Sequence, residues 1–163
     1  MKVTFVKKGD RRYAVEVHRD RYPDLWCGSI GYDAWLPHDL LHFVAEAEFG
    51  LDGAVFGDLA VGGNARIFQS FDPQLTTKMW RKQRMSRTRL RDGRSSEQLA
   101  WELEQGWRAR SLSLELQQKL DDLADRWHAL QVGGSLTLEW PRPEGRKRHP
   151  PRERRRPTAT RQR

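Results

Sequence analysis

The chain contains a single cysteine, Cys27, among its 163 residues, and it has no long hydrophobic run. One thiol can form neither an intramolecular disulfide nor a metal site built from several thiolates. A membrane-spanning helix needs about 18 or more consecutive apolar residues, and no segment approaches that length. The N-terminus alternates polar and apolar residues, so we expect no signal peptide. These absences predict a cytoplasmic protein with no membrane partner.

Several short motifs of enzymes are also missing. The sequence has no Gly-x-Gly-x-x-Gly fingerprint, no Gly-Lys-Ser/Thr phosphate-binding loop and no Gly-x-Ser-x-Gly nucleophile elbow. Gly62, Gly63 and Asn64 are better interpreted as a turn, and Cys27 as a buried structural thiol. We therefore favour a function other than catalysis.

The net charge of +8 is concentrated at the C-terminus. Residues 141–163 hold ten Lys or Arg against two Glu, so residues 1–140 are neutral as a whole. A segment so rich in Arg and Pro cannot bury enough apolar surface to fold, and we expect a disordered basic tail. Its two basic runs are made of Arg146, Lys147 and Arg148, and of Arg154, Arg155 and Arg156.

These basic runs predict binding to the phosphate backbone of a nucleic acid, without reading of the bases. An acidic protein is another partner that such a tail would suit. The alternative is a terminus that only keeps the protein in solution, and the sequence leaves these possibilities open.

Alternating apolar residues predict an antiparallel sheet. Residues 2–7 and 12–18 alternate on either side of a Gly-Asp turn and should form a hairpin, to which residues 135–140 add a final strand. Shorter strands are expected near Ile30 and over residues 66–71.

Helical signals separate these strands. Pro37 and Gly50 delimit a helix over residues 37–49, and a short helix is expected over residues 54–61. A basic segment over residues 74–90 is a further helix candidate. Ser95, followed three residues later by Gln98, is typical of a capping box and predicts the start of another helix.

The last helix has the clearest periodicity. Apolar residues recur in steps of four and three from Leu116 to Leu130, ending before Gly133. With a short connection to the preceding helix, this segment should form an antiparallel helical hairpin. Its leucine seam is either core or a surface for a protein partner.

Together these patterns predict an α+β domain over residues 1–140. We expect a small antiparallel sheet, made of the N-terminal hairpin and the C-terminal strand, packed on helices that include the C-terminal helical hairpin. The disordered basic tail follows over residues 141–163.

The most specific chemical signal is a polar stripe on the helix over residues 37–49. His38, His42 and Glu46 follow one another at intervals of four, so they lie along one side of the helix. Two imidazoles one turn apart and a carboxylate are a ligand set for zinc or another divalent metal, with a position left open for water. The alternative is the solvent side of an ordinary amphipathic helix.

The spacing also permits a comparison with zinc peptidases. Their His-x-x-x-His helix carries a Glu directly after the first His as general base. Asp39 occupies that place here and is one methylene shorter. We therefore expect a metal-binding accessory protein rather than a peptidase.

Two resemblances rest on this segment. Residues 38–42 read His-Asp-Leu-Leu-His, which resembles the His-Asp-x-x-His zinc motif of the ubiquinone-biosynthesis scaffold family. That family has a Glu after eleven further residues, where this chain has Ala54. The longer pattern Leu-Pro-His-Asp-x-x-His-Phe, with residues 31–33 and 54–60, resembles a family of small uncharacterised bacterial proteins and implies no function.

Other residues could complete a metal site. His18 on the second strand, Asp33 before the helix and Asp58 on the short helix are candidates, although each is more often a plain surface residue. His128, beside Trp127, is better interpreted as a residue at the boundary of the core.

Overall fold

The computed structural model describes residues 1–31, 35–65, 67–72 and 88–141. The strands are β1 (Lys2–Gly9), β2 (Arg12–His18), β3 (Leu25–Gly31), β4 (Gln69–Ser70) and β5 (Ser135–Glu139). The helices are α1 (His38–Phe49), α2 (Val55–Ala60), α4 (Thr88–Arg108) and α5 (Leu114–His128).

The strands form one antiparallel sheet in the order β4-β3-β2-β1-β5. Phe5, at the centre of β1, is paired with Val15 of β2 on one side and Leu136 of β5 on the other. The N-terminal hairpin and its pairing with the final strand are thus confirmed. A strand is present near Ile30, as β3, but it has seven residues and is as long as β2, in a region that the sequence indicated to be mainly loop. Of residues 66–71, only Gln69 and Ser70 form a strand, as β4.

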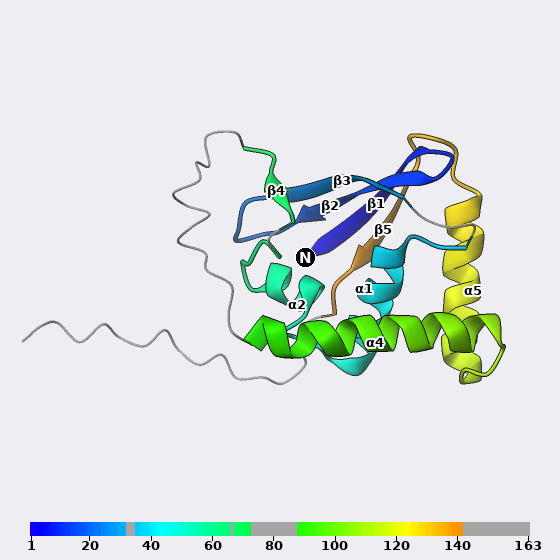
Figure 1. Ribbon diagram of the computed structural model, residues 1–163. Helices are drawn as coiled ribbons and strands as arrows, with labels where there is room; N and C mark the ends of the chain where they lie inside the picture. Colours follow the sequence, from blue (N-terminus) through cyan, green and yellow to red (C-terminus); the bar gives the residue numbers. More distant parts are fainter. Residues whose placement is uncertain (32–34, 66, 73–87, 142–163) are drawn as a thin grey trace, which may run out of the picture.

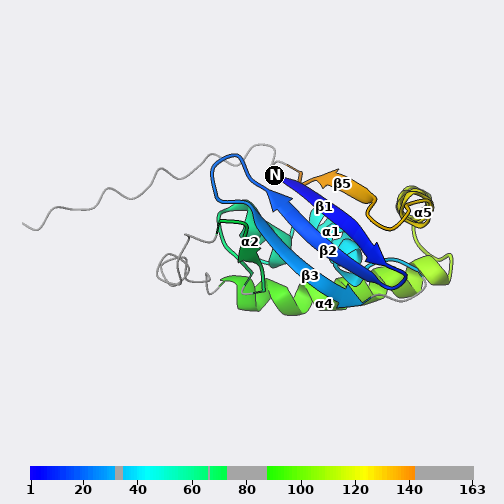
Figure 2. The ribbon, with the colours of Figure 1, turned by 90° about the horizontal axis from the view of Figure 1, so that it is seen from above.

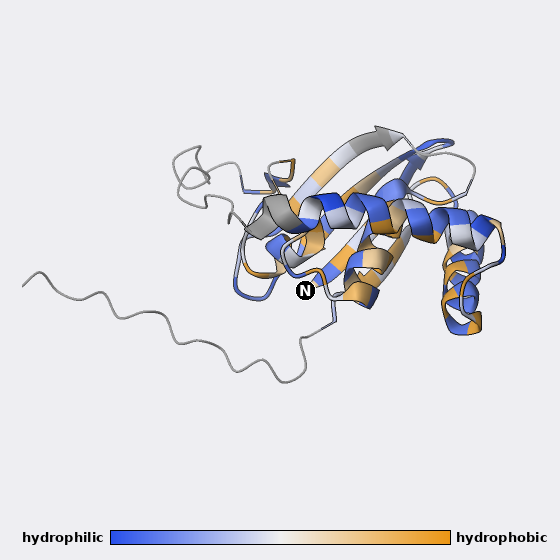
Figure 3. Ribbon diagram, turned by 60° about the horizontal axis from the view of Figure 1, so that its bottom comes forward, coloured by the Kyte–Doolittle hydropathy of each residue, from blue (hydrophilic) through white to orange (hydrophobic). Residues whose placement is uncertain are grey.

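The elements are arranged in three layers (Figures 1 and 2). The sheet covers one side of α1 and α2, and α4 runs across the other side of these two helices. Helix α5 stands at the end of the molecule beside β5. Because α1 lies between the sheet and α4, it is buried on two sides, and in Figure 3 it is largely apolar.

An aromatic cluster joins the sheet to α1 and α2. The ring centroid of Phe5 lies 6.3 Å from that of Phe43 on α1 and 6.4 Å from that of Phe56 on α2. Trp140, just after β5, completes the cluster at 5.5 Å from Phe43. Rings at such separations contribute both buried apolar area and favourable edge contacts, so this cluster fixes α1 against the sheet.

Helix α1 ends at the predicted residue and begins one residue later than predicted, since Pro37 lies just before its first residue. Pro37 stands at the N-cap, and its carbonyl accepts hydrogen bonds from the amides of Leu40 and Leu41. Gly50 ends the helix in the left-handed conformation, at φ 66°, which a residue without a side chain adopts without strain. The short helix expected over residues 54–61 is also present, as α2.

The prediction that Ser95 caps the start of a helix was wrong. Helix α4 already begins at Thr88 and passes through Ser95 without interruption. The reason is tertiary: α4 packs across α1, and the neighbouring Ser96 is buried in that contact. The basic helix expected over residues 74–90 lies mostly outside the described residues.

The C-terminal helices meet at a wider angle than a packed hairpin requires. Figure 1 shows α5 running steeply across the direction of α4, not alongside it. Their contact is at the connection, where the indole nitrogen of Trp107 donates to Asp121 at 2.8 Å. Helix α5 turns away because its seam packs on the sheet, where Trp127 lies edge-on to Tyr13.

The α+β class is therefore confirmed, with an antiparallel sheet packed on helices. In the described part of the chain, no helix combines the length and the apolar character of a membrane span. The predicted tail lies outside the described residues beyond Pro141, and with it the two basic runs.

Candidate metal centre

The two histidines of α1 face α4. His42 is buried, with 5% of its surface exposed, whereas the side chain of His38, one turn earlier, is 53% exposed. Their Nε2 atoms lie 3.0 Å apart. The alternative that this stripe is the solvent side of an amphipathic helix is therefore wrong for His42, because α4 covers the His42 side chain.

A carboxylate from α4 joins the two imidazoles. Oε2 of Glu97 lies 3.3 Å from Nε2 of His42 and 3.6 Å from Nε2 of His38. These three residues form a group of potential metal ligands whose donor atoms all lie within 4.8 Å of one another. The side chain of Glu97 is 70% exposed, so one side of the group is open to solvent.

The separations of the three donor atoms match a metal-bound arrangement. Ligand atoms held about 2.0–2.1 Å from a tetrahedral zinc ion lie about 3.3 Å from one another. The observed edges of the triangle are 3.0, 3.3 and 3.6 Å. One cation at this point would therefore contact all three residues after shifts of a few tenths of an ångström.

Ser96 determines which nitrogen of His42 is available. The Ser96 hydroxyl donates to Oε1 of Glu46 at 2.8 Å and lies 2.7 Å from Nδ1 of His42. When Glu46 is ionised, the Ser96 hydroxyl donates to its carboxylate, so the hydroxyl oxygen accepts the Nδ1–H of the imidazole. The lone pair of neutral His42 is thus on Nε2, which faces His38 and Glu97.

Glu46 occupies a different place from the one the stripe suggested. It is fully buried, and its carboxylate accepts the backbone amides of Val55 and Phe56 at 3.1 and 2.7 Å. It thereby satisfies amides in the first turn of α2 that have no partner within that helix. The structure brings His38 and His42 together with Glu97, and it places Glu46 behind Ser96.

Burial shifts the pKa of His42, within the group of potential ligands, and that of Glu46, behind it. It raises the pKa of Glu46 to about 7, although the hydrogen bonds from Ser96 and from the amides of α2 lower it. Burial also lowers the pKa of His42, against the opposing effect of Glu97. A neutral His42 is the form that binds a metal ion.

The other candidate ligands lie elsewhere and have other partners. His18 lies 3.0 Å from the carboxylate of Asp24. Asp58 is buried and accepts the amide of Ala65 at 3.2 Å. Nε2 of His128 lies 2.7 Å from the carbonyl of Trp35, and Asp33 is outside the described residues.

Two further sequence interpretations can be compared with the structure. Cys27 is half-buried, and burial raises the pKa of its thiol, which agrees with an unreactive structural cysteine. The leucine seam of α5 belongs to the core: Leu120, Leu123 and Trp127 are buried. The seam is therefore not a free surface for a protein partner.

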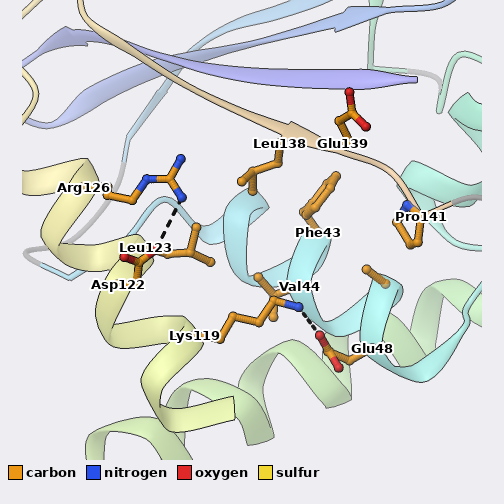
Figure 4. A pocket seen from close by; sticks show the side chains of 11 residues that line it. Phe43, Val44, Glu48, Lys119, Asp122, Leu123, Arg126, Leu138, Glu139 and Pro141 are labelled. Carbon is orange, nitrogen blue, oxygen red and sulfur yellow. Dashed lines mark hydrogen bonds and ion pairs between the residues drawn. The ribbon is translucent and has the colours of Figure 1, made fainter. Parts of the chain in front are cut away.

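A separate cavity of about 350 Å³ lies between α1, α5 and β5 (Figure 4). Phe43, Leu123 and Leu138 give it an apolar lining. Charged groups at its rim pair with each other, Lys119 with Glu48 and Arg126 with Asp122. Because these charged groups already have partners, the cavity is a weaker functional candidate than the group of His38, His42 and Glu97 on the opposite side of α1.

Sequence reasoning missed Ser96 and Glu97. A signal for the first exists in retrospect: Ser96, Ala100, Leu103 and Trp107 recur at helical spacing and are all buried. Small residues in such a stripe indicate a close approach of another helix. Glu97 shows no such signal, because an exposed Glu on a helix is the commonest of surface residues.

Comparisons with known proteins add nothing to this geometry, since no family model, no curated protein and no solved structure matches the chain. The two resemblances that rest on the His-Asp-x-x-His segment therefore stay predictions. The same holds for the nucleic-acid or acidic partner of the tail, whose basic residues lie outside the described part of the chain.

Proposed function

We propose that the protein binds a divalent transition metal ion, with zinc as the first candidate, through Nε2 of His38, Nε2 of His42 and a carboxylate oxygen of Glu97. The observation that carries this proposal is the triangle of donor atoms with edges of 3.0 to 3.6 Å. Glu97 is thus the proposed carboxylate ligand, in place of Glu46, which the sequence pattern had predicted.

The composition of the ligand set also supports the proposal. Two imidazoles and one carboxylate suit zinc and other borderline divalent metals, whereas calcium and magnesium prefer sites made wholly of oxygen. Structural zinc sites have four protein ligands, and sites that exchange ligands keep one position open. The proposed site has three protein ligands and one side open to solvent, so it resembles zinc sites that keep one coordination position open.

Electrostatics gives a second reason. In the ligand-binding tautomer of His42, the Nε2 lone pair faces the carboxylate of Glu97 at 3.3 Å. Two electron-rich atoms at this distance repel each other unless a positive charge lies between them. A proton shared with His38 would reduce that repulsion, and a divalent cation would reduce it more.

Glu46 and Ser96 act behind the site in this proposal. Ligating histidines usually donate their second ring N–H to an oxygen, which orients the ring and raises its basicity. Ser96 provides that oxygen for His42, and Glu46 orients Ser96. The role is that of an accessory metal-binding protein in the cytoplasm, where a single cysteine would remain reduced.

The test is calorimetric titration of the full chain with Zn²⁺ after chelator treatment. We expect one ion per chain. His38→Ala and Glu97→Gln should each weaken zinc binding by about 100-fold, because each variant removes one of the three protein ligands. Both side chains are largely exposed, so these variants should fold.

Two matched variants control for the loss of a histidine or of a negative charge. His18→Ala removes a surface histidine that is paired with Asp24, and Glu102→Gln removes an exposed carboxylate of the same helix. Both should bind zinc like the original chain. Equal affinities for all five proteins, or no binding at all, would refute the proposed function.

A further inference from the structure

A groove opens beside the proposed metal site. It has a volume of about 570 Å³ and is lined by Arg11, Arg12, Gly31, Leu36, His38, Leu41 and Glu104. His38 belongs both to this groove and to the metal group. A metal ion bound at His38 would therefore adjoin the space that the two arginines line.

The elements that surround the groove come from different parts of the fold. The arginines lie at the turn from β1 to β2, His38 begins α1, and Glu104 lies on α4, two turns after the ligand Glu97. Each is carried by, or directly adjoins, a strand or helix of the fold. The groove is thus built by the tertiary structure and not by one flexible loop.

The charges of the groove favour an anion. Glu104 accepts a hydrogen bond from Arg108, which offsets much of its negative charge. A divalent ion held by Glu97 keeps one net positive charge, and the guanidinium group of Arg12 adds to it. Guanidinium groups bind carboxylates and phosphates through paired hydrogen bonds, and a metal with an open position binds the same oxyanions.

We propose that this groove binds a small organic anion carrying carboxylate or phosphate groups, with one oxygen on the metal ion and another anionic group on Arg11 and Arg12. The inference rests on the proposed function, because it needs the metal at His38. It assigns the class of ligand that the open position takes. The buried side chains of Leu36 and Leu41 form the base of the groove.

The test measures binding of succinate and of inorganic phosphate to the full chain, by calorimetry, in the zinc-loaded and the metal-free state. The double variant Arg11→Gln/Arg12→Gln is compared with Lys8→Gln/Arg21→Gln, which removes the same charge at residues outside the groove. Zinc affinity is measured first for all proteins, so that the two proposals are tested separately.

We expect zinc to bind to all three proteins and the anion to bind to the zinc-loaded original chain and to the control. The arginine variant should lose about tenfold or more in affinity for the anion, as expected for charge-assisted hydrogen bonds. Preference for succinate over phosphate would identify a carboxylate ligand, and the reverse preference a phosphate.

Two results would overturn the inference. Zinc binding without anion binding, or anion binding that is the same in the arginine variant as in the control, rejects the groove as an anion site and leaves the metal site standing. Failure of zinc to bind to the original chain rejects the proposed function, and with it the basis of this inference.

Discussion

The hydroxyl oxygen of Ser96 lies 2.7 Å from Nδ1 of His42, and this contact between α4 and α1 leaves Nε2 of the ring as the atom for the proposed metal ion. It explains why a serine is buried in the interface of the two helices. It also links the proposed metal site to Glu46, which holds the hydroxyl from the other side.

Replacing Ser96 by alanine should weaken zinc binding by about 10- to 100-fold, which is the usual cost of losing such a supporting contact. The Nδ1–H of His42 then has no acceptor, and the ring loses its preferred tautomer. Nitrogen NMR of the histidine rings in the metal-free protein checks the tautomer directly. Ser95→Ala, at the exposed neighbouring residue, should change neither property.

The charge of buried Glu46 predicts a pH dependence of stability. Burial raises its pKa from 4.5 to about 7, so the folded protein retains the proton over a range in which the unfolded chain releases it. This carboxyl group therefore stabilises the fold less as the pH rises from 4.5 to 7, by up to about 3 kcal/mol.

Denaturant unfolding of the metal-free protein from pH 5 to pH 8, compared with Glu46→Gln, measures this effect. The variant is expected to be less stable at pH 5, because the NH2 group of glutamine cannot accept a backbone amide, whereas both oxygens of a neutral or charged carboxyl group can. The difference between the two proteins should shrink as the pH rises. A difference independent of pH would show that Glu46 does not titrate in this range.

Tyr13 ties the sheet to the start of α1. Its hydroxyl donates to Asp39 at 2.7 Å, and its ring is fully buried. Tyr13→Phe should lower the free energy of unfolding by about 1.5–3 kcal/mol, the range for a hydrogen bond to a charged group. Thermal or urea unfolding measures the loss, and Tyr22→Phe, at a partly exposed tyrosine, should have little effect.

The basic tail predicts nucleic-acid binding that is independent of the metal. If its runs contact about 6 to 8 phosphates, the logarithm of the binding constant should fall with a slope of about −5 to −7 against the logarithm of the salt concentration. A chain that ends at Trp140 should lose oligonucleotide binding and retain zinc binding. Undiminished oligonucleotide binding by the shortened chain would exclude the tail as the binding element.

Local signals in the sequence were enough to predict much of the fold. Pro37 and Gly50 delimit α1 because both act through the backbone of their own neighbourhood. The alternation of β1, β2 and β5 predicted the central pairing, since one face of each strand is buried. Helix α4 was predicted less well because its start depends on the contact with α1.

The candidate site was predicted in part, for a similar reason. His38 and His42 are one turn apart on a single helix, so their proximity follows from helix geometry. Glu97 comes from a helix that begins 50 residues later in the chain, and only the packing of α4 on α1 brings it near. Glu46 met the spacing rule, but the amides of α2 and Ser96 engage its carboxylate.

The most direct test of the proposed metal site is an anomalous difference map at the zinc absorption edge, from crystals of the full chain grown with Zn²⁺. The account predicts one peak per chain, about 2.0–2.2 Å from Nε2 of His38, Nε2 of His42 and a carboxylate oxygen of Glu97. A map with no peak between these three residues, or with zinc bound only by other side chains, would contradict it.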